Sequence, residues 1–232
     1  MNMERISNES VVNEIIKRIT DSLKNEDLKP GDKIPTEIEL METLGVGRNS
    51  VREAIKMLSA MGVLEVRRGS GTYVVTKVSP AILNPLVFNL IIEPKSNNDL
   101  YELRVMFDGM VLLIAIDKAL DEDIKNIENV LLKAKYLLES KKGTIEEFVQ
   151  LDIDFHLEIL KSVHNPMIEY IGKTIVELLP KYIHKSISQK NGFQRSINNH
   201  SAILDIIRNR CKASAIETNE RTLAEWKDKW AE

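Results

Sequence analysis

The apolar residues of most of this chain recur with the 3.6-residue period of amphipathic helices, and β-prone sequence is confined to one short stretch. In that stretch, Gly62–Val75, two β-prone runs flank the sequence Arg-Arg-Gly-Ser-Gly, as in a β-hairpin. Apolar residues make up 43% of the 232 residues and the net charge is only −3, which excludes a disordered chain. We therefore predict a mainly α protein with one small hairpin.

Three helices are predicted ahead of the hairpin, over Glu9–Asn25, Thr36–Leu44 and Arg48–Ala60. Thr36 has a side chain suited to an N-cap, and Gly45-Val46-Gly47 forms a tight turn between the second and third helices. Two short helices joined by a tight turn and followed by a hairpin are the arrangement of a winged helix-turn-helix. We assign this domain to residues 1–77.

The sequence changes character after Lys77. Prolines and asparagines mark a connecting region over residues 78–98, around a short apolar segment at Leu86–Ile92, and we interpret it as a linker with a connecting helix. The later segments all have helical patterns, over Asp99–Ala119, Asp121–Ser140, Thr144–Val163, Pro166–Ile187, Gly192–Asn209 and Lys212–Trp230. Residues 99–232 are thus predicted to form an all-α bundle of six or seven helices.

The third predicted helix has two chemically distinct faces. Its inward face carries Val51, Ile55 and Leu58, whereas Arg48, Arg52 and Lys56 form one outward basic stripe. Asn49 and Ser50 lie in the first turn, where a recognition helix meets base edges. Arginine can bind guanine bidentately and asparagine can bind adenine. The alternative is an ordinary amphipathic helix with solvated charges, but the helices, turn and hairpin in this order favour DNA binding.

The hairpin and the local charge support the same interpretation. The predicted tip places Arg67 and Arg68 beside glycines, which permits close approach of the backbone to phosphates or a minor groove. The overall charge of −3 would argue against nucleic acid. However, Gly47–Tyr73 contains five basic and two acidic residues, and the acidic excess belongs to the second half of the chain. Positive charge is therefore concentrated on one predicted edge.

Three segments together resemble the GntR family of bacterial transcription regulators over about residues 10–75. They are Leu28–Glu37 (LKPGDKIPTE), Leu44–Leu58 (LGVGRNSVREAIKML) and Gly62–Val74 (GVLEVRRGSGTYV). The resemblance implies that Arg48 and Arg52 are the main operator-reading residues, supported by Asn49 and Ser50, and that the Arg68-Gly69 tip enters the minor groove. The expected DNA-contacting residues are Thr36, Glu37, Arg48, Asn49, Ser50, Arg52, Lys56, Arg67, Arg68 and Gly69.

Two positions depart from the family pattern. Ile38 stands where the family usually has an arginine that touches DNA, and Gly47 replaces the usual serine before the recognition helix. Glycine is an acceptable N-cap, so the fold is retained. The departures are expected to change DNA affinity or sequence preference.

The predicted bundle carries ionisable residues beside its apolar stripes. Asp152 and His156 lie one helical turn apart, and His200 belongs to the stripe of another helix. Together they form a plausible metal-binding set. The spacing alone is a weak signal, because most Asp-x-x-x-His pairs are ordinary helix pairs.

A second resemblance strengthens the metal hypothesis. Leu100–Asp108 (LYELRVMFD), Leu151–Ile159 (LDIDFHLEI), Asn165-Pro166 and Ser196–Ile207 resemble the FCD ligand-binding domain of the FadR branch. Many members of that family bind zinc, nickel or manganese through one aspartate and three histidines. Asp152, His156 and His200 match three of these positions, whereas Thr222 stands at the fourth and Asn219 lies one turn earlier. The ligand set is incomplete, so the site is expected either to use three protein ligands or to be metal-free.

The expected effector-binding residues are Arg104, Asp108, Asp152, His156, His200, Asn219 and Thr222. Arg104 has two interpretations: it could clamp an effector carboxylate, or it could form an ordinary i, i+4 ion pair with Asp108. His164 and His184 match no ligand position and are expected at the surface or partly buried. Trp226 and Trp230 are interpreted as packing residues rather than a ligand cage.

These observations predict a homodimeric transcription regulator, more commonly a repressor, that binds a palindromic double-stranded DNA operator and a carboxylated small-molecule effector. A metal-sensing regulator is the first alternative, and a metal-dependent hydrolase the second, although no additional general base is evident. The single cysteine, Cys211, cannot form an internal disulfide, which favours the cytoplasm. We find neither a transmembrane run nor a signal-peptide h-region, so no membrane partner is expected.

Overall fold

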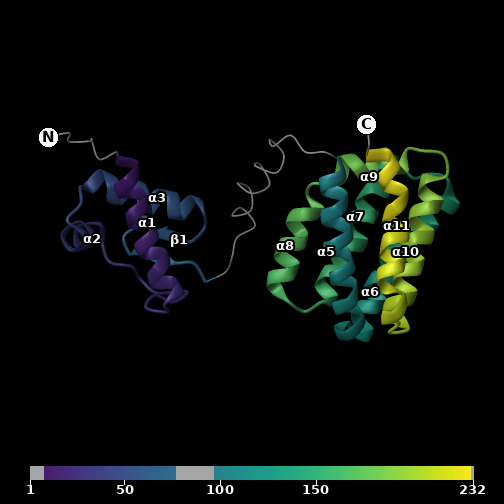
Figure 1. The fold of residues 1–232 in the computed structure, drawn as a ribbon, viewed down its shortest axis with the longest axis horizontal. Coiled ribbons are helices and arrows are strands. Elements are labelled where there is room, and N and C mark those ends of the chain that lie inside the picture. The colour runs from purple at the N-terminus through teal and green to yellow at the C-terminus, as the bar shows by residue number, and fades with distance from the viewer. Residues whose placement is uncertain (1–7, 77–96, 231–232) are drawn as a thin grey trace. The chain divides into compact units, whose positions relative to one another are not determined.

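The computed structural model describes residues 8–76 and 97–230, which belong to two compact units (Figure 1). The predicted linker over residues 78–98, with its apolar segment, lies outside the described residues except for the last two positions, which begin the helix α5. No helix in the described ranges is long and apolar enough to cross a membrane.

The N-terminal unit is a winged helix-turn-helix, as predicted. It contains α1 (Asn8–Lys24), α2 (Glu37–Leu44), α3 (Arg48–Ala60), β1 (Leu64–Arg67) and β2 (Gly71–Val74), and the two strands pair antiparallel. The helix α1 packs across α3 and supplies Ile15 to a core that also contains Val51 and Leu58, all at most 1% exposed. Burial of this apolar stripe fixes the opposite face of α3 toward solvent.

Local signals set the bounds of α2 and α3. The Thr36 hydroxyl accepts a hydrogen bond from the Glu39 amide, while the Glu39 carboxylate accepts one from the Thr36 amide, which makes a capping box. Gly45 ends α2 with φ of +64°, a conformation that glycine adopts without steric cost. Gly47 caps α3 without a side-chain hydrogen bond. The turn therefore depends on Gly45 for its shape.

The C-terminal unit is an all-α bundle with seven helices in residues 97–230. They are α5 (Asn97–Lys118), α6 (Asp121–Ser140), α7 (Ile145–Ser162), α8 (Pro166–Val176), α9 (Pro180–Ile187), α10 (Gly192–Arg208) and α11 (Ala215–Trp230). The helix α7 is central, because it packs against α5, α6, α8 and α9 (Figure 1). The core includes Ile116, Ile127, Phe155 and Ile207, none more than 1% exposed.

The structure corrects two predicted helices. The single helix predicted over Pro166–Ile187 is wrong: α8 ends at Val176, and α9 begins at Pro180. Proline lacks an amide hydrogen and disfavours helical conformation in the preceding residue, so it begins a helix more readily than it continues one. The helix predicted from Lys212 begins instead with a short 3₁₀ turn, Lys212–Ser214, and α11 starts at Ala215.

Candidate functional site

The outer face of α3 presents its basic side chains to solvent. The Arg48 side chain is 68% exposed and that of Arg52 is 53% exposed, and Lys56 is also exposed. Asn49 is exposed and Ser50 half-buried at the start of the helix. The sequence therefore places the predicted reading residues on the side of α3 opposite the core.

Both recognition arginines contact one carboxylate of α2. The Nε atom of Arg48 lies 3.6 Å from Oε2 of Glu37, and Nε of Arg52 lies 3.8 Å from Oε1 of the same residue. Glu37 thus fixes the two guanidinium groups beside each other. Thr36, predicted to contact DNA, uses its hydroxyl in the capping box of α2.

The two arginines of the wing differ in their surroundings. Arg67 pairs with Glu65 at 3.2 Å and lies over the Tyr73 ring, 4.4 Å from its centroid. Arg68 is exposed at the turn, where Gly69 has φ of +74°. Arg67 is therefore held against its own hairpin, and Arg68 is the arginine presented at the tip.

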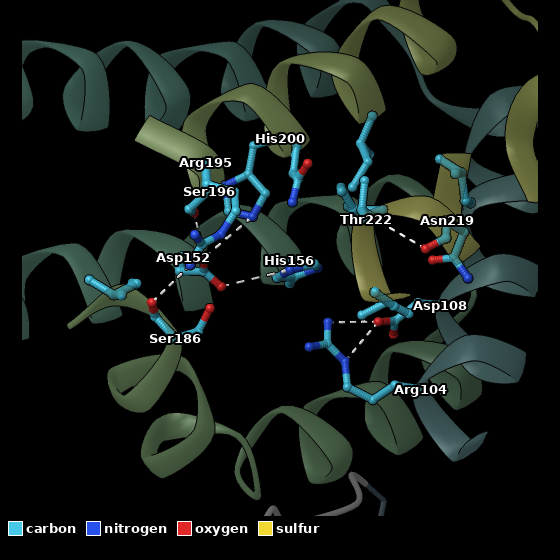
Figure 2. Close-up of a pocket in the computed structure, with 16 residues that line it drawn as sticks. Arg104, Asp108, Asp152, His156, Ser186, Arg195, Ser196, His200, Asn219 and Thr222 are labelled. Carbon is cyan, nitrogen blue, oxygen red and sulfur yellow. Dashed lines mark hydrogen bonds and ion pairs between the residues drawn. The ribbon is translucent and has the colours of Figure 1, made fainter. Parts of the chain in front are cut away.

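A polar pocket lies inside the C-terminal bundle, between residues of α5, α7, α9, α10 and α11 (Figure 2). All seven predicted effector-binding residues line it. The full described lining is Arg104, Asp108, Leu112, Asp152, His156, Ile159, Ser186, Ile187, Arg195, Ser196, Asn199, His200, Ile203, Asn219, Thr222 and Leu223. We call this cavity the polar pocket.

Asp152, His156 and His200 converge in the polar pocket. One ligand atom from each lies within 4.8 Å of the others. Nε2 of His200 is 3.4 Å from Oδ2 of Asp152, and Nε2 of His156 is 3.8 Å from Oδ1. The Ser196 hydroxyl donates a 2.7 Å hydrogen bond to Asp152 Oδ2, and Phe155 stacks on the His200 ring at 4.0 Å. These contacts orient the aspartate and one imidazole.

Burial keeps both imidazoles neutral. It lowers the pKa of His156 to about 3, assisted by the nearby positive charge of Arg104 and opposed by Asp152. Burial also lowers the pKa of His200, again against the attraction of Asp152. A neutral imidazole has a nitrogen lone pair for a metal ion, whereas an imidazolium does not.

The donor set fits a divalent transition metal. Asp152 Oδ1 is buried and accepts no hydrogen bond from the described residues, as expected of an oxygen reserved for a cation. One carboxylate and two imidazoles supply three ligands, fewer than the four of a closed structural zinc site. The set does not distinguish zinc, nickel and manganese.

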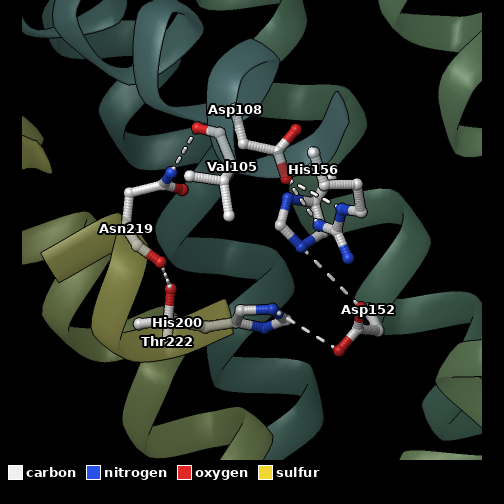
Figure 3. A network of polar contacts seen from close by, with 8 residues as sticks. Val105, Asp108, Asp152, His156, His200, Asn219 and Thr222 are labelled. Atoms are coloured by element: carbon white, nitrogen blue, oxygen red, sulfur yellow. Dashed lines mark hydrogen bonds and ion pairs between the residues drawn. The ribbon is translucent and has the colours of Figure 1, made fainter. Parts of the chain in front are cut away.

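Among the described side chains of α11, none adds a histidine or carboxylate to this set. The Thr222 hydroxyl donates to the Asn219 carbonyl at 2.9 Å, and the Asn219 side-chain amide donates to the Val105 carbonyl at 2.8 Å (Figure 3). Both residues are buried and line the polar pocket. The Asn219 bond joins α11 to α5, whereas the Thr222 bond stays within α11.

Arg104 forms the predicted ion pair with Asp108, and the pair lies in the wall of the polar pocket. Its Nη2 lies 2.7 Å from Asp108 Oδ2, and its Nε donates to the same oxygen at 2.9 Å, so the i, i+4 pair exists. The side chain is nevertheless 2% exposed and lines the polar pocket (Figure 2). The ion pair therefore positions the guanidinium inside the pocket.

Four polar lining residues escaped the sequence reasoning: Ser186, Arg195, Ser196 and Asn199. Ser196 lies four residues before His200 and thus on the same helix face, a signal that could have identified it. Ser186 enters the pocket on α9, a separate helix that the sequence reasoning did not predict. Its backbone carbonyl accepts a hydrogen bond from Arg195 at 3.2 Å.

The remaining histidines and tryptophans lie away from the metal-binding set. His164 pairs with Asp123 at 2.7 Å, and the His184 side chain is 51% exposed, 4.0 Å from Glu146. The structure does not describe the side chains of Trp226 and Trp230, so their packing role stays a prediction.

Comparison with known proteins identifies the family. The model of bacterial regulatory proteins of the gntR family matches residues 11–74, and the FCD domain model matches residues 99–225. The chain belongs to the GntR family. It is a GntR regulator with an FCD domain, and such proteins are DNA-binding transcription regulators rather than enzymes. The hydrolase alternative is thereby set aside.

Named GntR relatives and one solved structure agree with this assignment. The HTH-type transcriptional regulator LutR of Bacillus subtilis is 28% identical over 194 residues, covering 80% of this chain and 85% of LutR. The galactonate operon transcriptional repressor of Escherichia coli is 26% identical, covering 77% of this chain and 79% of the repressor. A Streptococcus agalactiae GntR structure superposes with a TM-score of 0.62 at 23% identity, covering 94% of this chain and 99% of the other, which shows a shared fold.

Proposed function

We propose that this GntR regulator is a homodimeric repressor whose operator affinity is controlled by a small carboxylic acid bound in the polar pocket. The observation that carries the proposal is the convergence of Arg104 with Asp152, His156 and His200 in one cavity of the FCD domain. Buried polar side chains gathered around a cavity are typical of a ligand site. The E. coli galactonate relative is named a repressor, which favours repression over activation for this regulator.

The polar pocket has the chemistry to bind a carboxylate. A guanidinium can donate two parallel hydrogen bonds to a carboxylate, and Arg104 is held in place by Asp108. Asp152, His156 and His200 would hold a divalent metal, which when bound supplies positive charge and open coordination positions for an anionic ligand. Asn199 and Ser196 add hydrogen-bonding groups for other polar atoms of the acid.

The winged helix supplies the operator contacts in this proposal. Arg48 and Arg52 would read base edges in the major groove, and Arg68 at the wing tip would reach the minor groove or its phosphates. Two copies of the chain would occupy the two half-sites of a palindrome. For the acid to control binding, it must bind the DNA-free and DNA-bound states with different affinity.

The DNA-binding part can be tested with an operator selected from random duplexes by the purified protein. Arg48→Ala and Arg52→Ala are each expected to weaken binding to that operator by about 1–3 kcal/mol in a gel shift, because each removes a base-reading guanidinium. Lys17→Ala, an exposed change on α1, is the control. Wild-type affinity in both arginine variants would refute the assignment of α3 as recognition helix.

The effector part is tested with the same operator. Small carboxylic acids, screened with and without added zinc or manganese, are expected to release the wild-type protein from the operator. Arg104→Gln should retain operator binding but lose the response. Acids that bind the protein without changing its operator affinity would contradict effector control.

A metal-sensing regulator is the second candidate, favoured by the three converging donors. In that case the ion alone would change operator affinity, and carboxylic acids would have no effect. Metal analysis of protein purified without a histidine tag, followed by titration of zinc into the gel shift, separates the two candidates.

A further inference from the structure

A second cavity adjoins the polar pocket and has a different chemistry. It lies between α5, α7 and α8, and Arg104, Asp108 and His156 line both cavities. The rest of its described lining is apolar or glycine: Phe107, Val111, Leu160, Gly172, Ile175, Val176 and Leu179. We call it the apolar side cavity.

The packing of α8 explains why this space exists. The helix packs closely on α7, because Gly172 has no side chain: a Cβ there would lie 2.3 Å from Leu160 Cδ2. Contacts between α8 and α5 are much sparser than those between α8 and α7. The apolar side chains of Met167 and Ile171 point to solvent, 75% and 50% exposed, rather than filling the gap. The space on the α5 side of α8 therefore stays open.

The geometry points to an effector that uses both cavities: a carboxylic acid with a short apolar side chain. Its carboxylate would lie at Arg104, on the wall that the two cavities share, and its side chain would fill the apolar side cavity. Other polar atoms of the acid would face the polar pocket. The inference rests on the proposed function, because it takes the polar pocket as the acid-binding site.

Elementary energetics favours this occupant. Away from Arg104, Asp108 and His156, the leucine, isoleucine and valine side chains of this cavity offer no hydrogen bonds to water, so an aliphatic group is the natural filling of that part. Each methylene moved from water into such a cavity should tighten binding about fourfold. The cavity is about half the size of the polar pocket, which favours a short side chain over a long acyl chain.

The test uses four 2-hydroxy acids that share one head group and differ only in side chain: glycolate, lactate, 2-hydroxyisovalerate and 2-hydroxyisocaproate. Affinity is measured by calorimetry on the full-length protein, with and without added manganese. In the wild-type protein, 2-hydroxyisovalerate is expected to bind at least tenfold tighter than glycolate. Val176→Ile and Val176→Phe narrow the apolar side cavity progressively. They should therefore reduce the gradient, meaning the rise in affinity with the size of the acid's side chain, while leaving glycolate affinity within about twofold.

Val130→Ile, a change of the same size on α6 away from both cavities, should keep the full gradient. Circular dichroism melting without acid identifies any variant that fails to fold, and Val176→Ile retains the test if Val176→Phe is lost. Two outcomes would refute the binding of the side chain in the apolar side cavity: glycolate binding as tightly as the larger acids, or folded Val176 variants that keep the full gradient. Either outcome leaves the acid-effector function standing. Binding of none of the four acids overturns both.

Discussion

At the residue scale, the DNA-reading face is organised by an acidic residue. Glu37 contacts the Nε atoms of both Arg48 and Arg52, which ties the two exposed side chains to one carboxylate of α2. Such exposed pairs are individually weak, on the order of 0.2–1 kcal/mol. In the proposed function, these pairs would act on DNA binding by orienting the two arginines rather than by adding stability.

Glu37→Gln should therefore reduce the preference of the protein for the selected operator over random duplex. Loss of the carboxylate removes a negative charge near the phosphates and frees both arginines, so affinity for random duplex should rise while affinity for the selected operator falls, each by about two- to fivefold. Fluorescence anisotropy with both duplexes measures the ratio. Glu42→Gln, which neutralises another acid of α2, should raise both affinities together; an unchanged ratio in Glu37→Gln would rule out positioning.

His156 gives the protein a pH dependence in the metal-free state. Burial lowers its pKa from 6.5 to about 3, so between these values the unfolded chain binds a proton that the folded chain does not. The free energy of unfolding should fall as pH drops from about 6.5 toward 3, by up to about 1.4 kcal/mol per pH unit for this residue. Urea denaturation at several pH values in the presence of a chelator gives the slope of the free energy of unfolding against pH, and this slope should be shallower for His156→Gln. Equal slopes in the variant and the wild-type protein would contradict the neutral imidazole.

The sequence predicted part of the polar pocket for a clear physical reason. Asp152 and His156 share a helix face by spacing alone, and His200 lay in an apolar stripe, so all three had to point inward. Arg195 and Asn199 flank that stripe on α10 and could not be assigned to the pocket by periodicity. Their place depends on how α9 and α10 approach each other, which is a tertiary property.

At the element scale, the helix that carries two of the three metal donors starts from a capping box. Thr144 accepts a hydrogen bond from the Glu147 amide, and Glu147 accepts one from the Thr144 amide. This arrangement was readable from the sequence, because Thr-x-x-Glu precedes an apolar run. The break between α8 and α9 was missed although Pro180 signals it, because the apolar pattern continues on both sides of the proline.

Thr144→Ala should cost about 1 kcal/mol of stability, since it removes one hydrogen-bond acceptor at the start of α7. Chemical denaturation measures the change, with Thr144→Ser as the conservative control that keeps the hydroxyl. A loss of metal or acid affinity beyond the stability change would show instead that the cap positions Asp152 and His156.

At the scale of the whole molecule, net charge conceals how the charges are distributed. The chain carries −3 overall, yet the segment from the recognition helix to the wing is basic. Splitting the sequence into segments revealed this distribution, and the fold accounts for it, because the arginines of α3 are exposed opposite its buried face. The apolar patterns of single segments could not predict how five helices are arranged around one pocket. These helices are α5, α7, α9, α10 and α11.

Operator binding should therefore depend strongly on salt despite the acidic total. With about four or five cations at each half-site, the logarithm of affinity should fall against the logarithm of salt concentration with a slope of about −4 per half-site. Anisotropy titrations from 50 to 300 mM KCl measure it, and Arg68→Ala should reduce the slope by about one unit per half-site. A slope near zero would be incompatible with phosphate contacts by the basic face.

The origin of the polar pocket in five helices has a consequence for the lifetime of the protein. An unfolded chain cannot assemble residues from α5, α7, α9, α10 and α11, so a ligand held there adds stability to the folded state alone. Proteases that capture transiently unfolded molecules would then degrade the occupied protein more slowly than the empty one. In the proposed function, the acid that releases the regulator from the operator would therefore also raise the amount of regulator, and the response to a second exposure would begin from a larger pool.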